Sequence, residues 1–164
     1  PADRVPILRL DPGGAAAPVS ALAFAPDGNS LFVGGFDKLV RVYSKKAGQW
    51  VPAEPLRLPV GPGNAGAVNA VAVSPDGKWL AVAGRAPMRD EAKFGQDGSV
   101  VDTKQIPPAM KRDLGTIYLF DLTKPNGNRV IRGMLGEIRA LAFATPSPAA
   151  GPVVVAAGIE WTDA

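Results

Sequence analysis

Two segments of the chain repeat one pattern of residues, and this repeat limits the folds that the chain can adopt. Residues 19–28 read VSALAFAPDG and residues 68–77 read VNAVAVSPDG, so the two copies begin 49 residues apart. A third copy begins at residues 138–144, which read IRALAFA. Each copy alternates apolar residues with small or polar ones, as expected of a half-buried strand. The repeat predicts a row of similar units, each built from several strands.

A Pro-Asp-Gly turn follows the strand in the first two copies. Proline presets φ, aspartate bonds its own backbone and glycine takes positive φ, so each copy is expected to continue as a hairpin. The further strands that the pattern predicts are residues 31–35, 39–43 and about 54–58 after the first copy, 79–84, 116–121 and 129–132 after the second, and 153–158 after the third, with residues 6–10 resembling an outer strand of an earlier unit.

This order of strands and turns resembles the WD repeat (WD40-like) family of β-propeller proteins, in a divergent form. A WD repeat has a Gly-His pair, a first strand, Pro-Asp-Gly, a second strand, a turn with Asp, and a third strand that ends in Trp-Asp. The residues at the corresponding positions are Gly14, Asp27, Gly28, Asp37 and Tyr43 in the first repeat, Gly63, Asp76, Gly77, Phe120 and Asp121 in the second, and Gly133 in the third. The resemblance implies an all-β fold, a β-propeller of four-stranded antiparallel blades, with about two and a half blades in this chain.

The chain departs from the family pattern at the histidine position. In the family, this histidine joins a Ser or Thr, the turn Asp and the Trp in a hydrogen-bonded tetrad. Here the position holds Ala15, Asn64 and Met134 in the three repeats, and the chain has no histidine. We therefore expect strand pairing and apolar packing to stabilise these blades in place of the tetrad.

The repeats divide the chain into expected parts of a single partial propeller domain, residues 1–164. These parts are an outer strand of a preceding blade with its linker (1–14), blade one (15–60), blade two (61–134) and an incomplete blade three (135–164). Propellers close into rings, which removes exposed sheet edges. We therefore expect the remaining blades to come from another segment of a longer polypeptide or from a second chain.

Blade two carries an insertion, residues 85–114, where blade one makes the same crossing almost directly. Loops of this length in a compact domain are usually functional or disordered. In resembling proteins, the face that carries this loop commonly receives partners. The side chains expected to meet acidic groups or to act as apolar anchors of a protein partner are Arg85, Met88, Arg89, Lys93, Phe94, Met110, Lys111 and Arg112. The alternative is a decoration that packs against its own domain.

Residue types absent from the chain exclude several classes of site. Without histidine or cysteine, no Ser-His or Cys-His nucleophile and no thiolate metal site can form, so no catalytic residue and no cofactor is predicted. The five acidic residues of the insertion do not follow EF-hand spacing, so no metal is predicted either. The net charge of +3 is scattered, which argues against nucleic acid. No apolar stretch is long enough for a membrane span.

The sequence favours a non-catalytic scaffold for protein–protein interaction. Two alternatives remain open, a propeller whose catalytic or ligand-binding residues lie outside this chain, and an accessory domain of a larger catalytic or redox protein, because a fold alone does not decide function. The compartment stays open as well, with the lack of cysteine and the start at Pro1 leaning toward an exported or periplasmic protein.

Overall fold

The computed structural model describes residues 17–58, 66–84, 114–124, 127–135, 137–145, 147 and 151–159. These residues form strands and no helix, which confirms the all-β prediction. The strands are β1 (Val19–Phe24), β2 (Ser30–Gly35), β3 (Leu39–Lys46), β4 (Gln49–Arg57), β5 (Val68–Val73), β6 (Trp79–Gly84), β7 (Leu114–Asp121), β8 (Arg129–Leu135), β9 (Glu137–Ala144) and β10 (Val153–Ile159).

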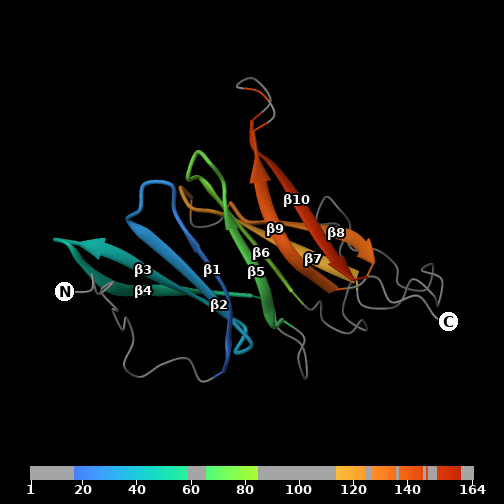
Figure 1. Cartoon of the computed structure of the whole chain (residues 1–164), viewed down its shortest axis with the longest axis horizontal. Helices are drawn as coiled ribbons and strands as arrows, with labels where there is room; N and C mark the ends of the chain where they lie inside the picture. The colour runs from blue at the N-terminus through green and yellow to red at the C-terminus, as the bar shows by residue number, and fades with distance from the viewer. Residues whose placement is uncertain are drawn as a thin grey trace, which may run out of the picture.

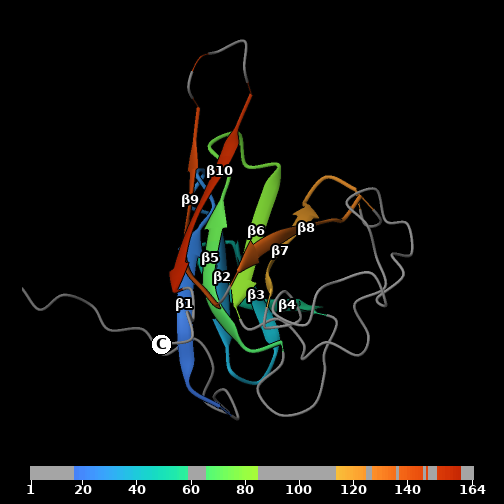
Figure 2. The ribbon, with the colours of Figure 1, turned by 90° about the vertical axis from the view of Figure 1, so that its right-hand side faces the viewer.

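The strands form three antiparallel sheets that follow one another across the molecule (Figure 1). Strands β1 to β4 make blade one, β5 to β8 make blade two, and β9 and β10 make a two-stranded sheet that we call blade three. The first strands of the three sheets, β1, β5 and β9, pack side by side, and Figure 2 shows this row from the side. Blades that share such a row of inner strands form part of a β-propeller.

The Pro-Asp-Gly segments form the predicted turns. Gly28 and Gly77 have φ values of 68° and 69°, in the left-handed region that glycine adopts without steric cost. The turn aspartates fix the backbone beyond them. Asp27 accepts a hydrogen bond from the Asn29 amide at 2.9 Å, and Asp76 accepts one from the Lys78 amide at 3.1 Å. The hairpins β1–β2 and β5–β6 therefore close as the sequence predicts.

The aromatic residues predicted near the ends of the third strands occupy equivalent places. Tyr43 pairs with Leu31, and Phe120 pairs with Leu80, so both lie opposite the second residue of the preceding strand. Both aromatic side chains are buried. Asp121, which follows Phe120, accepts hydrogen bonds from the amides of Thr123 and Lys124 at 2.9 and 3.1 Å and so begins the next turn.

The outer strands are longer than predicted. Strand β4 begins at Gln49 and not near residue 54, because Ala47 and Gly48, with φ of 48° and 81°, form a tight turn that lets Lys46 pair with Gln49. Strand β8 extends from Arg129 to Leu135 and β3 to Lys46. Leu114 belongs to β7, so the loop between β6 and β7 is residues 85–113 and not 85–114.

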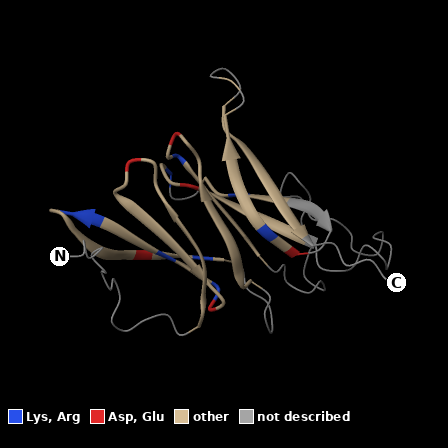
Figure 3. Ribbon diagram, viewed as in Figure 1, with Lys and Arg blue, Asp and Glu red and all other residues tan. Residues whose placement is uncertain are grey.

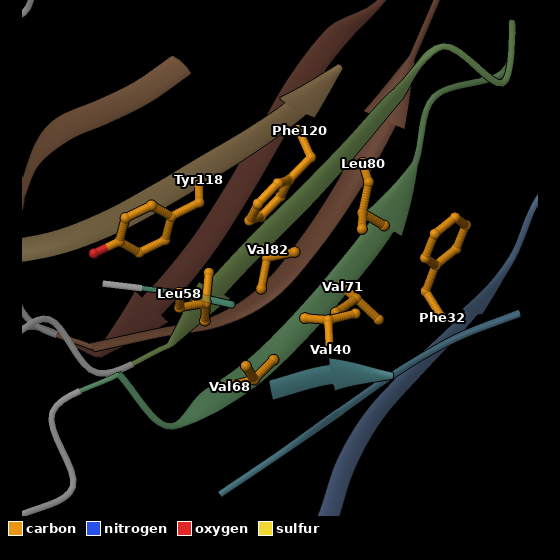
Figure 4. Packing of buried hydrophobic residues seen from close by; sticks show 9 residues of the cluster. All are labelled: Phe32, Val40, Leu58, Val68, Val71, Leu80, Val82, Tyr118 and Phe120. Atoms are coloured by element: carbon orange, nitrogen blue, oxygen red, sulfur yellow. The ribbon is translucent and has the colours of Figure 1, made fainter. Parts of the chain in front are cut away.

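Two apolar layers hold the blades together, one at each blade boundary. Between blades one and two, Figure 4 shows the side chains of Phe32, Val40 and Leu58 packed on residues of blade two. Those residues are Val68, Val71, Leu80, Val82, Tyr118 and Phe120. Between blades two and three, Ile138 packs with Ala81, Ala83 and Ile117. Burial of this kind contributes about 1.5–3 kcal/mol for each large apolar side chain, so the blades depend on their neighbours for stability.

Candidate functional site

The strands give each blade two ends, which carry different connections between strands. At one end lie the β1–β2 and β5–β6 turns, residues 26–29 and 75–78, which we call the turn end. At the opposite end, β6 finishes at Gly84 and β7 starts at Leu114, which we call the insertion end. The connection from β2 to β3 and the first residues of the inner strands also lie at the insertion end.

The predicted partner-binding residues, from Arg85 to Arg112, lie outside the described residues. Gly14 and Gly63 lie outside them as well, and Gly133 lies within β8. The strands that flank the insertion pair with each other up to its base, where Gly84 lies opposite Thr116. The insertion therefore leaves the sheet of blade two intact and emerges from it at the insertion end.

Each inner strand carries a β-bulge near its start, at the second residue of β1 and β5 and at the third residue of β9. The pairing between β1 and β2 passes from Val19 to Ala21 and leaves Ser20 as the extra residue. Asn69 is the extra residue in β5, and Arg139 in β9. A bulge redirects the side chain of the extra residue. In Ser20 and Asn69 the redirected side chain reaches the neighbouring blade.

Two of these bulge residues form hydrogen bonds between blades. The hydroxyl of Ser20 donates to the main-chain carbonyl of Val68 in blade two, and it also lies 3.3 Å from the carbonyl of Gly34. The amide of Asn69 donates to the carbonyl of Ile138 in blade three at 3.2 Å. It also donates to the carboxylate of Glu137 at 2.5 Å. Arg139, the third bulge residue, forms an ion pair with Glu137 at 3.3 Å.

A glycine lies opposite the start of every inner strand. A side chain on Gly84 would clash with the carbonyl oxygen of Ala67, and one on Gly158 would clash with that of Glu137. At Gly35 the equivalent atom, the carbonyl oxygen of Pro18, would lie 3.0 Å from a Cβ. The glycine permits the close backbone approach that accompanies each bulge.

The turn aspartate of blade one forms an ion pair in place of the family tetrad. Oδ2 of Asp37 lies 2.6 Å from Nη2 of Arg41, and the two side chains are 12% and 20% exposed. A partly buried pair of this kind keeps both charges from being left alone in a low-dielectric environment. Ala15 and Asn64, at two of the histidine positions, lie outside the described residues.

Sequence reasoning missed the bulge residues, although the repeat contained a signal. Ser20, Asn69 and Arg139 fall at one position of the three copies, and this position is polar each time within an otherwise apolar or small segment. A polar residue at one fixed position of a buried strand indicates a recurring polar contact. The direction of that contact, toward the next blade, follows only from the bulge.

The described stretches contain neither a cluster of metal-binding side chains nor a membrane-spanning helix. Across them, no three His, Cys, Asp or Glu side chains come close enough to hold a metal ion. Within the same stretches, the structure has no helix that could cross a lipid bilayer.

The chain is similar to solved WD40 structures and matches a family model. A structure of U3-55K is 15% identical, with a TM-score of 0.37, over 86% of this chain and 52% of that one. A structure of RRP9 WD40 repeats is 16% identical, with a TM-score of 0.39, over 79% of this chain and 43% of that one. The chain therefore spans about half the length of either structure. No curated protein matches the chain. The family model described as "WD domain, G-beta repeat" matches residues 7–44 and 56–100, half of the sequence, and the chain belongs to the WD40 repeat family.

Proposed function

We propose that the chain is a non-catalytic scaffold that binds a protein partner at the insertion end of its blades. The observation that supports this proposal is the pairing of Gly84 with Thr116, because it anchors both ends of residues 85–113 to a rigid sheet. A long loop on a rigid scaffold is a common carrier of binding residues. WD40 repeats are also generally interaction modules, and this chain lacks the histidine and cysteine that nucleophilic sites usually need.

The chemistry of the loop suggests a partner surface that is acidic and partly apolar. Five cationic residues and three large apolar ones form the proposed contact set, which is Arg85, Met88, Arg89, Lys93, Phe94, Met110, Lys111 and Arg112. Methionine and phenylalanine provide adaptable apolar contacts, and arginine forms bidentate bonds with carboxylates. The Asp37–Arg41 pair and the Glu137–Arg139 pair lie at the same end of the blades.

Replacement of the loop tests this proposal. In one variant, residues 86–113 are exchanged for a short turn copied from residues 36–38 of blade one, and in a control variant, Lys45 and Lys46 in β3 are changed to alanine. Partners captured by the full chain are identified by mass spectrometry and then purified for titration by calorimetry. We expect the loop variant to lose binding and the control to keep it. Equal affinity of both variants for every purified partner would contradict the proposal.

We further propose that other blades cover the outer faces of blades one and three. Val19 and Leu22 in β1 are 52% and 62% exposed, whereas Val68 and Val71, at the same positions of β5, are 0% and 9% exposed under blade one. Strands β1 and β5 thus have the same apolar pattern, but within the described residues a neighbouring blade covers the apolar side chains of β5 only. Native mass spectrometry tests the idea for the purified chain, which has a mass of 17.0 kDa. A stable monomer that binds no apolar dye and no further blades would contradict it.

A further inference from the structure

A groove crosses the boundary between blades one and two at the turn end. Its volume is about 540 Å³, within the range of sites that hold small ligands or side chains. Phe32, Val42, Leu56 and Leu122 give it an apolar floor. The groove lies at the opposite end of the strands from the insertion.

The groove exists because blade one has a small residue where blade two has a large one. Ser30, which lines the groove, begins β2 and pairs with Ser44 of β3. Trp79 begins β6 and pairs with Asp121 of β7, so Trp79 holds the equivalent position of blade two. The ring of Trp79 fills this position and is covered by Arg129, whose guanidinium carbon lies 5.3 Å from the ring centroid. Blade one leaves the same space open.

The rim of the groove is acidic. Asp27, Glu54 and Asp76 line it, and none of the described residues that line it is Lys or Arg. Figure 3 shows the acidic positions at the two neighbouring turns and on β4. The hydroxyl of Ser74 donates to the Asp76 carboxylate at 2.5 Å, which lowers the pKa of Asp76. The Nζ atom of Lys78 lies 4.0 Å from this carboxylate and balances part of the charge. Because Asp27, Glu54 and Asp76 line the groove and no described lysine or arginine does, its lining carries negative charge, although the chain has a net charge of +3.

A second hollow continues the groove along the outer side of the blades. Leu56 and Leu122 line both hollows, and the second one adds Phe120 together with the charged residues Arg57, Asp121 and Lys124. Together they provide space for several residues of an extended peptide. The acidic rim belongs to the groove and not to the second hollow, so the groove sets the charge that a ligand needs.

We propose that this groove binds a linear segment of a protein partner in which a large apolar side chain is flanked by Lys or Arg. The apolar side chain would pack on Phe32, Val42 and Leu56, where a desolvated pocket provides most of the binding free energy. The flanking cations would meet Asp27, Glu54 and Asp76, which set the preference for a basic segment. This site does not depend on the insertion or on a partner bound there.

Labelled peptides of known sequence test the proposal with the full chain. The probes are fluorescein-labelled decapeptides with Leu, Phe or Met at the centre and Lys or Arg on both sides. One matched set has Ser at the centre, and another has Glu in place of every basic residue. We expect fluorescence anisotropy to detect only the first set. Equal binding of the Glu set, equal binding of the Ser set, or no binding at about 1 mM protein would each overturn the proposal.

Two variants locate the bound peptide. Ser30→Trp copies the residue of blade two and should weaken binding about tenfold or more by filling the hollow. Glu54→Gln removes an exposed rim charge and should weaken binding about threefold at low salt, with less effect at high salt. The control is Arg139→Gln at the insertion end, which should keep the affinity of the unmodified chain. Urea unfolding of each variant checks the fold. Unchanged affinity in folded Ser30→Trp would place the peptide elsewhere and overturn the assignment.

The loop replacement described above separates this site from the proposed insertion-end function. We expect the loop variant to bind the basic peptides with unchanged affinity, and Ser30→Trp to keep any partner of the insertion end. Loss of peptide binding in the loop variant would contradict the independence of the two sites. Failure of either proposal therefore leaves the other one testable.

Discussion

The side-chain amide of Asn69 donates a hydrogen bond to the main-chain carbonyl of Ile138, 3.2 Å away in the neighbouring blade. The same relationship links the preceding pair of blades, where Ser20 donates to Val68. Both donors are the extra residue of a bulge at the start of an inner strand. The boundaries between blades therefore combine apolar packing with one directed polar contact at a fixed position.

Removal of the Asn69 amide should destabilise the chain. Asn69→Ala leaves the carbonyl of Ile138 and the largely buried carboxylate of Glu137 without this donor, so we expect a loss of about 1–3 kcal/mol in the free energy of unfolding. Asn69→Ser, which copies blade one, should recover part of the loss. Urea unfolding followed by circular dichroism measures both. Asn128→Ala, at an exposed position, serves as the control, and a similar loss in this control would contradict the prediction.

Substitution of Gly84 should be more harmful than substitution of a turn glycine. In Gly84→Ala the new methyl group meets the carbonyl of Ala67, which belongs to the backbone and cannot rotate away. In Gly28→Ala the methyl group meets no atom within 4 Å, and the cost is the positive φ alone, about 1 kcal/mol. Thermal unfolding of the two variants should give the lower midpoint for Gly84→Ala. The reverse order would show that the bulge of β5 relaxes easily.

Equivalent apolar residues of blades one and two should respond differently to truncation. Val71→Ala removes buried groups between the blades, so we expect a loss of about 1–3 kcal/mol. Leu22→Ala acts at the same position of blade one, where the side chain is exposed, so its loss should stay within about 0.5 kcal/mol. Denaturant unfolding of the purified chain compares them. An equally large loss in Leu22→Ala would indicate that another blade covers β1 in the purified protein.

The Asp76 carboxylate should contribute to the acid sensitivity of the fold. Its pKa lies below the ordinary value of 3.8, first because of the Ser74 hydroxyl and then because of the Lys78 amide. A depressed folded-state pKa stabilises the native state above the unfolded pKa, and this stability is lost as the pH falls through the folded pKa.

The Ser74→Ala variant tests this contribution. It should raise the pKa of Asp76 toward 3.8 and lower the melting temperature at pH 7. The difference from the unmodified chain should shrink as the pH falls below 3.8. Melting curves between neutral and strongly acidic pH measure it, and a difference that is constant with pH would contradict the role of Asp76.

The repeat predicted most of the fold because its signals are local. The alternating apolar residues and the Pro-Asp-Gly turn lie within a few residues of each other. Together they predict the inner hairpins. The full length of β4 was not predicted, because Pro52 and Pro55 interrupt the strand pattern and are tolerated at the outer position of blade one. The bulges could not be predicted, because a bulge is a shift in the pairing of two strands. The residues of β1 or β5 alone do not show which residue of β2 or β6 lies opposite each of them.

The groove at the turn end was beyond sequence reasoning for a different reason. Its floor and rim combine the β1–β2 turn and residues of β2, β3 and β4 with the β5–β6 turn and Leu122, which follows β7. No spacing in the sequence brings these segments together. The contrast between Ser30 and Trp79 carries meaning only once the strand registers show that the two residues hold the same position.

The hydrogen bonds that Ser20 and Asn69 donate to main-chain carbonyls of another blade run in one direction along the row, each to the following blade. The row of blades therefore has a direction and two different end faces. Val19 and Leu22 are exposed at its first face, and Val153 and Val155 are exposed at its last face. Two faces that differ in this way suit a head-to-tail contact, which leads to a closed ring when the rotation per blade is right and to an open filament when it is not. A twofold dimer would bring together two identical faces. The bulge donors of one chain would then not meet the main-chain carbonyls that accept their hydrogen bonds at the other blade boundaries.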